Sequence, residues 1–134
     1  MARLAIPTDV AAAIAGFDLS PMALIFMLMF FYLVLGCFLD GLSTIVMTLP
    51  VTLPLVIAAG FDPIWFGVFL IITIEMAQIT PPIGFNLFVI KSITGQKIGE
   101  IAIAALPFCL IMIGLVLFLT FNPGIVTWLP NTMR

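Results

Sequence analysis

Two long stretches without a charged side chain constrain this protein more than any other feature. Residues 21–39 and 101–121 are uncharged throughout, and as helices they would be about 28 and 31 Å long, close to the ~30 Å hydrocarbon core of a bilayer. Only 7% of all residues are charged and 64% are hydrophobic, whereas an ordinary soluble domain has about a quarter charged residues. The sequence therefore predicts an all-α integral membrane protein.

The composition also excludes several function classes. The chain has no His and only four Lys and Arg residues, which argues against a His-based metal or haem site and against a basic nucleic-acid-binding surface. Cys37 and Cys109 lie inside apolar runs without ligand spacing, so we interpret them as unpaired thiols that pack in the interior. Because no nucleophile–base pair is present, we expect neither an enzyme nor a bound cofactor.

Polar and Pro-containing interruptions divide the chain into segments. In chain order, they predict an interfacial segment over 1–20, a helical hairpin over 21–59, a discontinuous transmembrane helix over 60–97 broken at 79–84, a last transmembrane helix over 98–121 and a tail over 122–134. The residues alone leave open whether the hairpin crosses the membrane twice or dips in and returns. Trp65 and Trp128 are expected to be interfacial anchors.

The interruptions free backbone carbonyl groups inside the predicted bilayer. Pro81 and Pro82 lack the N–H groups that would bond to the carbonyls of Ala77 and Gln78, and lipid offers no replacement partner. Carbonyls freed in this way, beside hydroxyls such as that of Thr80, form an oxygen-rich environment suited to Na⁺, and nearby helix N-termini favour an anionic group.

Each of these features also has a simpler structural interpretation. Asp40 and Gly41 are compatible with a solvated turn between two spans, and the Thr48-x-Pro50 and Thr52-x-Pro54 pairs with ordinary kinks that hydroxyl back-bonding repairs. Glu75 is compatible with either a functional intramembrane carboxylate or a point of water access.

The basic residues suggest an orientation. Lys91 and Lys97 are the only basic cluster, so we place the loop before the last helix in the cytoplasm. The first residues then lie outside with no span before them, which is unusual. We therefore expect the chain to be the C-terminal piece of a larger protein.

Several motifs resemble one transporter family. The run LGCFLDG from Leu35 to Gly41 and the run EMAQITPPIGFNLFVI from Glu75 to Ile90 are similar to the large membrane subunit of tripartite ATP-independent periplasmic (TRAP) transporters. The likeness covers roughly residues 20–130 but only the last third of such a subunit. These subunits resemble other ion-coupled transporters built from inverted repeats, each with a re-entrant hairpin and a discontinuous helix.

The resemblance implies roles for residues at two places. It implies a re-entrant hairpin whose tip lies near the bilayer midplane, beside an unwound segment of the discontinuous helix. The tip would comprise Asp40, Gly41, Ser43 and Thr44. The unwound segment would comprise Ile79, Thr80, Pro81, Pro82 and Gly84. From the residues alone, Asn86 is compatible either with a carbonyl oxygen in the site or with only a hydrogen bond to a neighbouring helix. Na⁺ would bind at Asp40, Thr80 and Gly84, with the anionic substrate alongside.

The resemblance also implies a mechanism, partners and a location. Such a subunit imports an organic acid (a dicarboxylate, keto acid or sugar acid) across the bacterial inner membrane by a Na⁺-driven elevator movement. A periplasmic binding protein delivers the substrate, and a small membrane subunit braces the scaffold. The alternatives are a truncated remnant without activity and a non-transporting membrane scaffold or accessory subunit.

Overall fold

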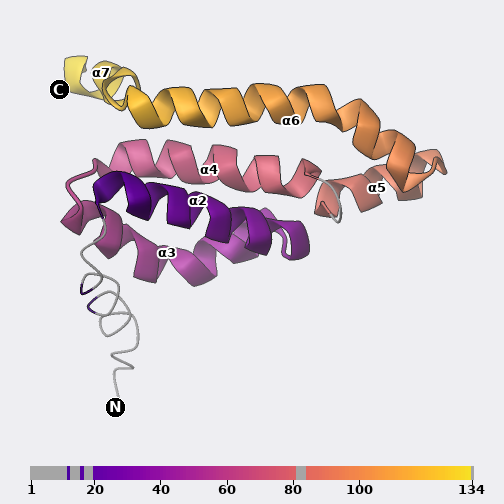
Figure 1. Cartoon of the computed structure of the whole chain (residues 1–134), viewed down its shortest axis with the longest axis horizontal. Coiled ribbons are helices and arrows are strands. Elements are labelled where there is room, and N and C mark those ends of the chain that lie inside the picture. The colour runs from indigo at the N-terminus through magenta and orange to yellow at the C-terminus, as the bar shows by residue number, and fades with distance from the viewer. Residues whose placement is uncertain (1–11, 13–15, 17–19, 81–83, 134) are drawn as a thin grey trace, which may run out of the picture.

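The computed structural model describes residues 12, 16, 20–80 and 84–133. Most of the segment expected at the interface, 1–20, lies outside the described residues, as do Pro81 and Pro82. The described part is built from helices and short connections (Figure 1). The prediction of an all-α chain is confirmed.

Helices α2 (Pro21–Phe38) and α3 (Gly41–Ala58) form a helical hairpin. The Ser20 side chain accepts a hydrogen bond from Ala23 N at 3.2 Å and caps α2, and Pro21 occupies the first turn, where its missing N–H costs nothing. Two residues, Leu39 and Asp40, connect the helices. Pro50 and Pro54 lie inside α3.

Helix α4 (Pro63–Ile79) is the centre of the structure. It contacts α2 and α3 on one side and α6 (Ile98–Phe121) on another, and Figure 1 shows these helices running side by side. The core consists mainly of aromatic and branched side chains of α2 and α4. Its buried members are Leu24, Ile25, Leu28, Tyr32, Val56, Trp65, Phe66, Phe69, Leu70, Ile74 and Val116.

Trp65 lies in this core and not at a lipid-facing surface. Its side chain is fully buried and stacks against Phe61 and Phe69, with ring centroids 4.9 and 5.3 Å away. Its indole N–H donates to Leu119 O at 2.9 Å. The expectation that Trp65 is an interfacial anchor is therefore wrong, because its ring packs between helices, and α6 provides the acceptor that a buried indole N–H needs.

Helix α5 (Phe85–Thr94) follows the end of α4, and Gly95 terminates it in a left-handed conformation, with φ of 69°. Helix α6 then returns along α5 and α4 (Figure 1). The sequence pattern predicts only a tail over 122–134, whereas the structure has α7 (Gly124–Thr132) there.

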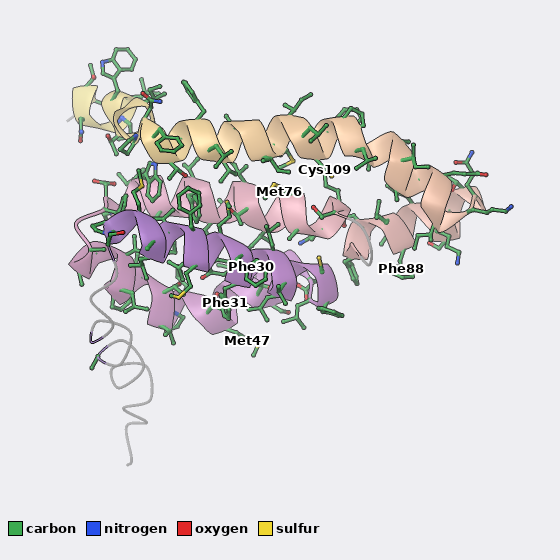
Figure 2. All side chains as sticks on the ribbon, viewed as in Figure 1. Phe30, Phe31, Met47, Met76, Phe88 and Cys109 are labelled. Carbon is green, nitrogen blue, oxygen red and sulfur yellow. The ribbon has the colours of Figure 1, made fainter. Side chains whose placement is uncertain are left out.

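Much of the helical surface is apolar. Figure 2 shows Phe30 and Met47 among the labelled side chains, and these are 68% and 71% exposed, whereas Met76 and Cys109 are buried between helices. In the part of the chain that the structure describes, three helices, α2, α3 and α6, are long and apolar enough to cross a membrane. Exposed apolar surface on this scale is typical of a chain that is embedded in lipid or covered by further protein.

Candidate functional site

The connection between α2 and α3 is a capped helix start. The Asp40 carboxylate accepts a hydrogen bond from Ser43 N at 3.0 Å, and the Thr44 hydroxyl donates to Asp40 O at 2.9 Å. Asp40 is thus an N-cap, a position that Asp favours because it satisfies N–H groups the helix leaves free. Asp40 and Ser43 are exposed, whereas Thr44 is fully buried.

Helix α4 ends at the second place that the sequence singles out. Ile79 is its last residue, and Thr80 caps it in an extended conformation. The Thr80 hydroxyl donates to Met76 O at 2.6 Å, and Thr80 N bonds to Ala77 O at 3.3 Å. The last turn of α4 therefore ends with a hydrogen bond of the tighter i→i+3 type. Helix ends often form such a bond where the N–H of the i→i+4 type is missing, as it is at Pro81.

Two thiols contact the carbonyls at this helix end. Cys37 of α2 donates to Ala77 O at 3.6 Å, and Cys109 of α6 donates to Ile79 O at 3.4 Å. The sequence indicates only packing roles for these cysteines, because no local pattern signals their contacts with α4. A weak S–H donor is suited to such carbonyls because it supplies a partner without adding a strongly polar group to an apolar region.

Gly84 begins the second half of the interrupted helix. Its φ of 35° belongs to the positive-φ region that favours glycine. A Cβ at Gly84 would lie 2.7 Å from Gln78 O, so the chain also needs glycine there for close backbone approach. Asn86, one residue into α5, is partly buried.

The hairpin tip and the end of α4 lie against each other. A Cβ at Gly41 would overlap the Gln78 amide nitrogen and would lie 3.1 Å from an Ile74 methyl carbon. A Cβ at Gly36 would lie 2.6 Å from the Ala77 Cβ. Glycine at these two positions lets the hairpin approach α4 more closely than any other residue would allow.

The predicted site residues are thus brought together only in part. Gly41 and Gly84 both lie against Gln78, a residue that the predicted site does not include. Within the described residues, the Asp40 carboxylate bonds to its own helix start and not to Thr80. The described residues contain no cluster of His, Cys, Asp and Glu that could hold a metal.

The hydroxyls of α3 serve the hairpin itself. Tyr32 of α2 pairs with Thr48 at 3.0 Å and with Thr52 at 2.8 Å. Thr48 and Thr52 also donate to the carbonyls of Thr44 and Thr48, at 2.6 and 3.1 Å. These hydroxyls therefore back-bond to the carbonyls one turn earlier. The carbonyls that Pro50 and Pro54 leave without an N–H donor are different ones, those of Val46 and Pro50.

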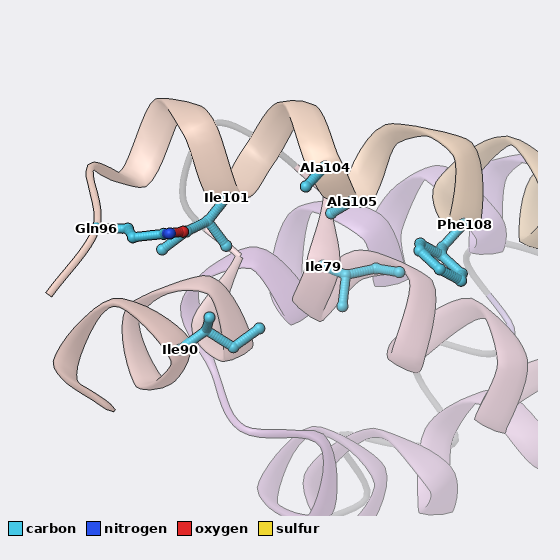
Figure 3. Close-up of a pocket in the computed structure, with 7 residues that line it drawn as sticks. All are labelled: Ile79, Ile90, Gln96, Ile101, Ala104, Ala105 and Phe108. Carbon is cyan, nitrogen blue, oxygen red and sulfur yellow. The ribbon is translucent and has the colours of Figure 1, made fainter. Parts of the chain in front are cut away.

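A pocket of about 340 Å³ lies between α5, α6 and the end of α4 (Figure 3). Gln96 is the one polar residue of its lining, which otherwise consists of Ile79, Ile90, Ile101, Ala104, Ala105 and Phe108. Such walls offer almost no hydrogen-bond donors to a carboxylate. The lining of this pocket therefore differs from the carbonyl and hydroxyl groups of Ala77 and Thr80 at the end of α4.

Comparisons with known proteins agree with this polytopic membrane architecture. Residues 1–125 match the family described as the tripartite ATP-independent periplasmic transporter, DctM component. The C4-dicarboxylate TRAP transporter large permease protein DctM of Pseudomonas aeruginosa is 32% identical over 94% of this chain and 30% of its own length. The 2,3-diketo-L-gulonate TRAP transporter large permease protein YiaN of Escherichia coli is 36% identical over 80% of this chain and 25% of its own length.

A third relative, the isethionate TRAP transporter permease protein DctMQ of Oleidesulfovibrio alaskensis, is 32% identical over 90% of this chain and 19% of its own length. The architecture and these likenesses are those of a family of multi-pass inner-membrane permeases, whose members are transporters and not enzymes. The chain belongs to the DctM family of TRAP transporters. It spans less than a third of the length of these relatives.

Proposed function

We propose that this chain forms part of the transport domain of a large permease subunit that imports an organic acid together with Na⁺. One observation carries the proposal: a hairpin tip and a helix interruption, far apart in sequence, meet at Gly41, Gln78 and Gly84. Helix ends and unwound backbone that converge in a membrane are the sites where secondary transporters bind ions and anionic substrates.

The chemistry of the interruption favours Na⁺. Among the described residues, the carbonyls of Ala77 and Ile79 accept hydrogen bonds from Thr80 N and from two weak thiol donors, at 3.3 to 3.6 Å. The Thr80 hydroxyl donates its proton to Met76 O, which leaves its lone pairs available to a cation. Na⁺ would then bind among Thr80, Gly84 and the tip near Asp40.

The relatives indicate the substrate class. Their names specify C4-dicarboxylates, 2,3-diketo-L-gulonate and isethionate, all of which are small organic anions. We infer a substrate of this class, delivered by a periplasmic binding protein, with a small membrane subunit as partner. In this proposal α2 and α3 form a re-entrant hairpin, Lys91 and Lys97 face the cytoplasm, and the transport domain moves as an elevator. The chain would supply the C-terminal part of that domain.

The Thr80→Val substitution in the full-length subunit tests the ion site. We expect the Na⁺ concentration for half-maximal uptake, measured in proteoliposomes with the cognate binding protein, to rise about tenfold, equivalent to about 1.4 kcal/mol. Thr94→Val is the matched control, because its hydroxyl makes the same kind of bond, to Ile90 O at 2.8 Å, at the exposed end of α5. Unchanged Na⁺ dependence in Thr80→Val would remove Thr80 from the site, and uptake that needs no Na⁺ would contradict the coupling.

A further inference from the structure

Gln78 contacts both sides of the proposed site. It is the penultimate residue of α4, and its side chain is 7% exposed. Its amide nitrogen occupies the space that a Cβ at Gly41, the first residue of α3, would need. Its backbone oxygen occupies the space that a Cβ at Gly84, the residue before α5, would need. One residue therefore touches the hairpin tip with its side chain and the far side of the interruption with its backbone.

These contacts leave no room for either side to move independently. Glycine stands at both partner positions, so the Gln78 atoms lie against backbone and not against side chains that could change rotamer. Next to the amide, Ile74 and Ala77 are buried and pack against Gly41 and Gly36. Closely packed groups of this kind transmit a displacement and do not absorb it. A change in the backbone around Gln78 must therefore move the start of α3 or open a gap beside it.

We infer that Gln78 is a positioning residue that couples the ion site in the interruption to the hairpin tip. The inference rests on the proposed Na⁺ site. Oxygens that turn toward a bound Na⁺ would reorient the peptide groups of the last turn of α4, where the Gln78 carbonyl lies. The Gln78 side chain would carry this change to Gly41 and hold the tip in place. Without Na⁺ the same contact would allow the tip to move away.

Labelling of the tip tests this coupling without knowledge of the substrate. Leu42, the second residue of α3, is 74% exposed, so Leu42→Cys in the full-length subunit provides a reporter for maleimide in proteoliposomes. The subunit without the reporter gives the background from Cys37 and Cys109. We expect labelling to be about fivefold or more slower in NaCl than in KCl, the lower end of typical couplings between sites. Thermal stabilisation of the purified subunit by NaCl over KCl measures Na⁺ binding separately.

The substitutions at Gln78 should separate coupling from binding. Gln78→Ala should bring the NaCl and KCl labelling rates close together while NaCl still stabilises the protein. Gln78→Met, which conserves side-chain length, should retain the difference between the two salts. Gln96→Ala, at an exposed glutamine between α5 and α6, is the matched control and should change neither measurement.

The results distinguish a failure of the proposed Na⁺ site from a failure of the coupling role of Gln78. No stabilisation of the parent by NaCl would contradict the proposed Na⁺ site itself. Stabilisation by NaCl together with a full labelling difference in Gln78→Ala would overturn the coupling role alone, as would loss of the difference in Gln78→Met. If Gln78→Ala does not fold, Gly41→Ala tests the same contact from the other side, because its Cβ displaces the amide. It should also abolish the labelling difference, and an unaltered difference would overturn the role.

Discussion

The distance between the hairpin and α4 is decided by single residues. Gly36 lies against Ala77, and the two backbones are close enough that even one methyl group at Gly36 would lie 2.6 Å from the Ala77 Cβ. Small residues at helix contacts serve this purpose in membranes, where packing rather than the hydrophobic effect drives association of helices. Cys37, the next residue, then reaches Ala77 O.

Gly36→Ala should therefore destabilise the full-length subunit although alanine is the better helix former. We expect a loss of about 1–3 kcal/mol, the usual cost of overpacking, seen as a lower melting temperature in detergent. Gly114→Ala in α6 is the matched control, because a Cβ there meets no heavy atom within 4 Å. Equal melting temperatures for the two variants would contradict the close contact between α2 and α4.

At the scale of elements, the hairpin is one unit. The Tyr32 hydroxyl joins α2 to Thr48 and Thr52 of α3, and both helices are long enough to cross a membrane. The tip nevertheless packs against the end of α4, the helix that is interrupted there. Helix α4 has 17 residues and α5 has 10, so the contact lies part of the way along the combined length of these two helices and not at its end. This position favours the proposed re-entrant arrangement of the hairpin.

The depth of the tip can be measured with Asp40→Cys. For a re-entrant hairpin we expect slow labelling by a membrane-impermeant maleimide in sealed vesicles. Gln96→Cys, in the exposed connection next to Lys97, sets the rate for a fully accessible loop. Rapid labelling of Asp40→Cys from one side would mean that the tip is a surface turn between two full spans.

At the scale of the whole molecule, α4 holds the other helices together. It packs against α2, α3, α5, α6 and α7. Near its start, Trp65 bonds to Leu119 O of α6 and stacks between two phenylalanines. At its end, Cys109 of α6 contacts Ile79 O. The long helix α6 is thus attached to α4 at two levels.

Trp65→Phe should loosen this attachment. The ring stack largely remains, but the Leu119 carbonyl loses its donor, which costs about 1–3 kcal/mol when the group stays buried. We expect a lower melting temperature of the full-length subunit. Trp128→Phe is the control, since Trp128 is 68% exposed. If both variants melt alike, the indole bond contributes nothing to stability.

Much of the fold can be predicted from local sequence patterns. Uncharged runs of span length predict helices because lipid leaves backbone groups no partner outside the chain. Asp40 before Gly41 and Gly95 after Thr94 are local signals of a helix start and a helix end, and the structure has helix boundaries at both.

The meeting of distant residues was decided only by the tertiary structure. No local pattern distinguishes Gln78 from a helical surface residue, and none distinguishes the two cysteines from ordinary packing residues. Their roles depend on the contacts that α2, α3 and α6 make with the end of α4. Trp65 illustrates the same limit: its sequence neighbours suggested an interface, whereas its partner lies 54 residues away. The sequence by itself determined which segments are helical and apolar, since each residue's propensity and hydration act locally. Which polar groups face one another depends on packing between segments, and this is settled only when the helices assemble.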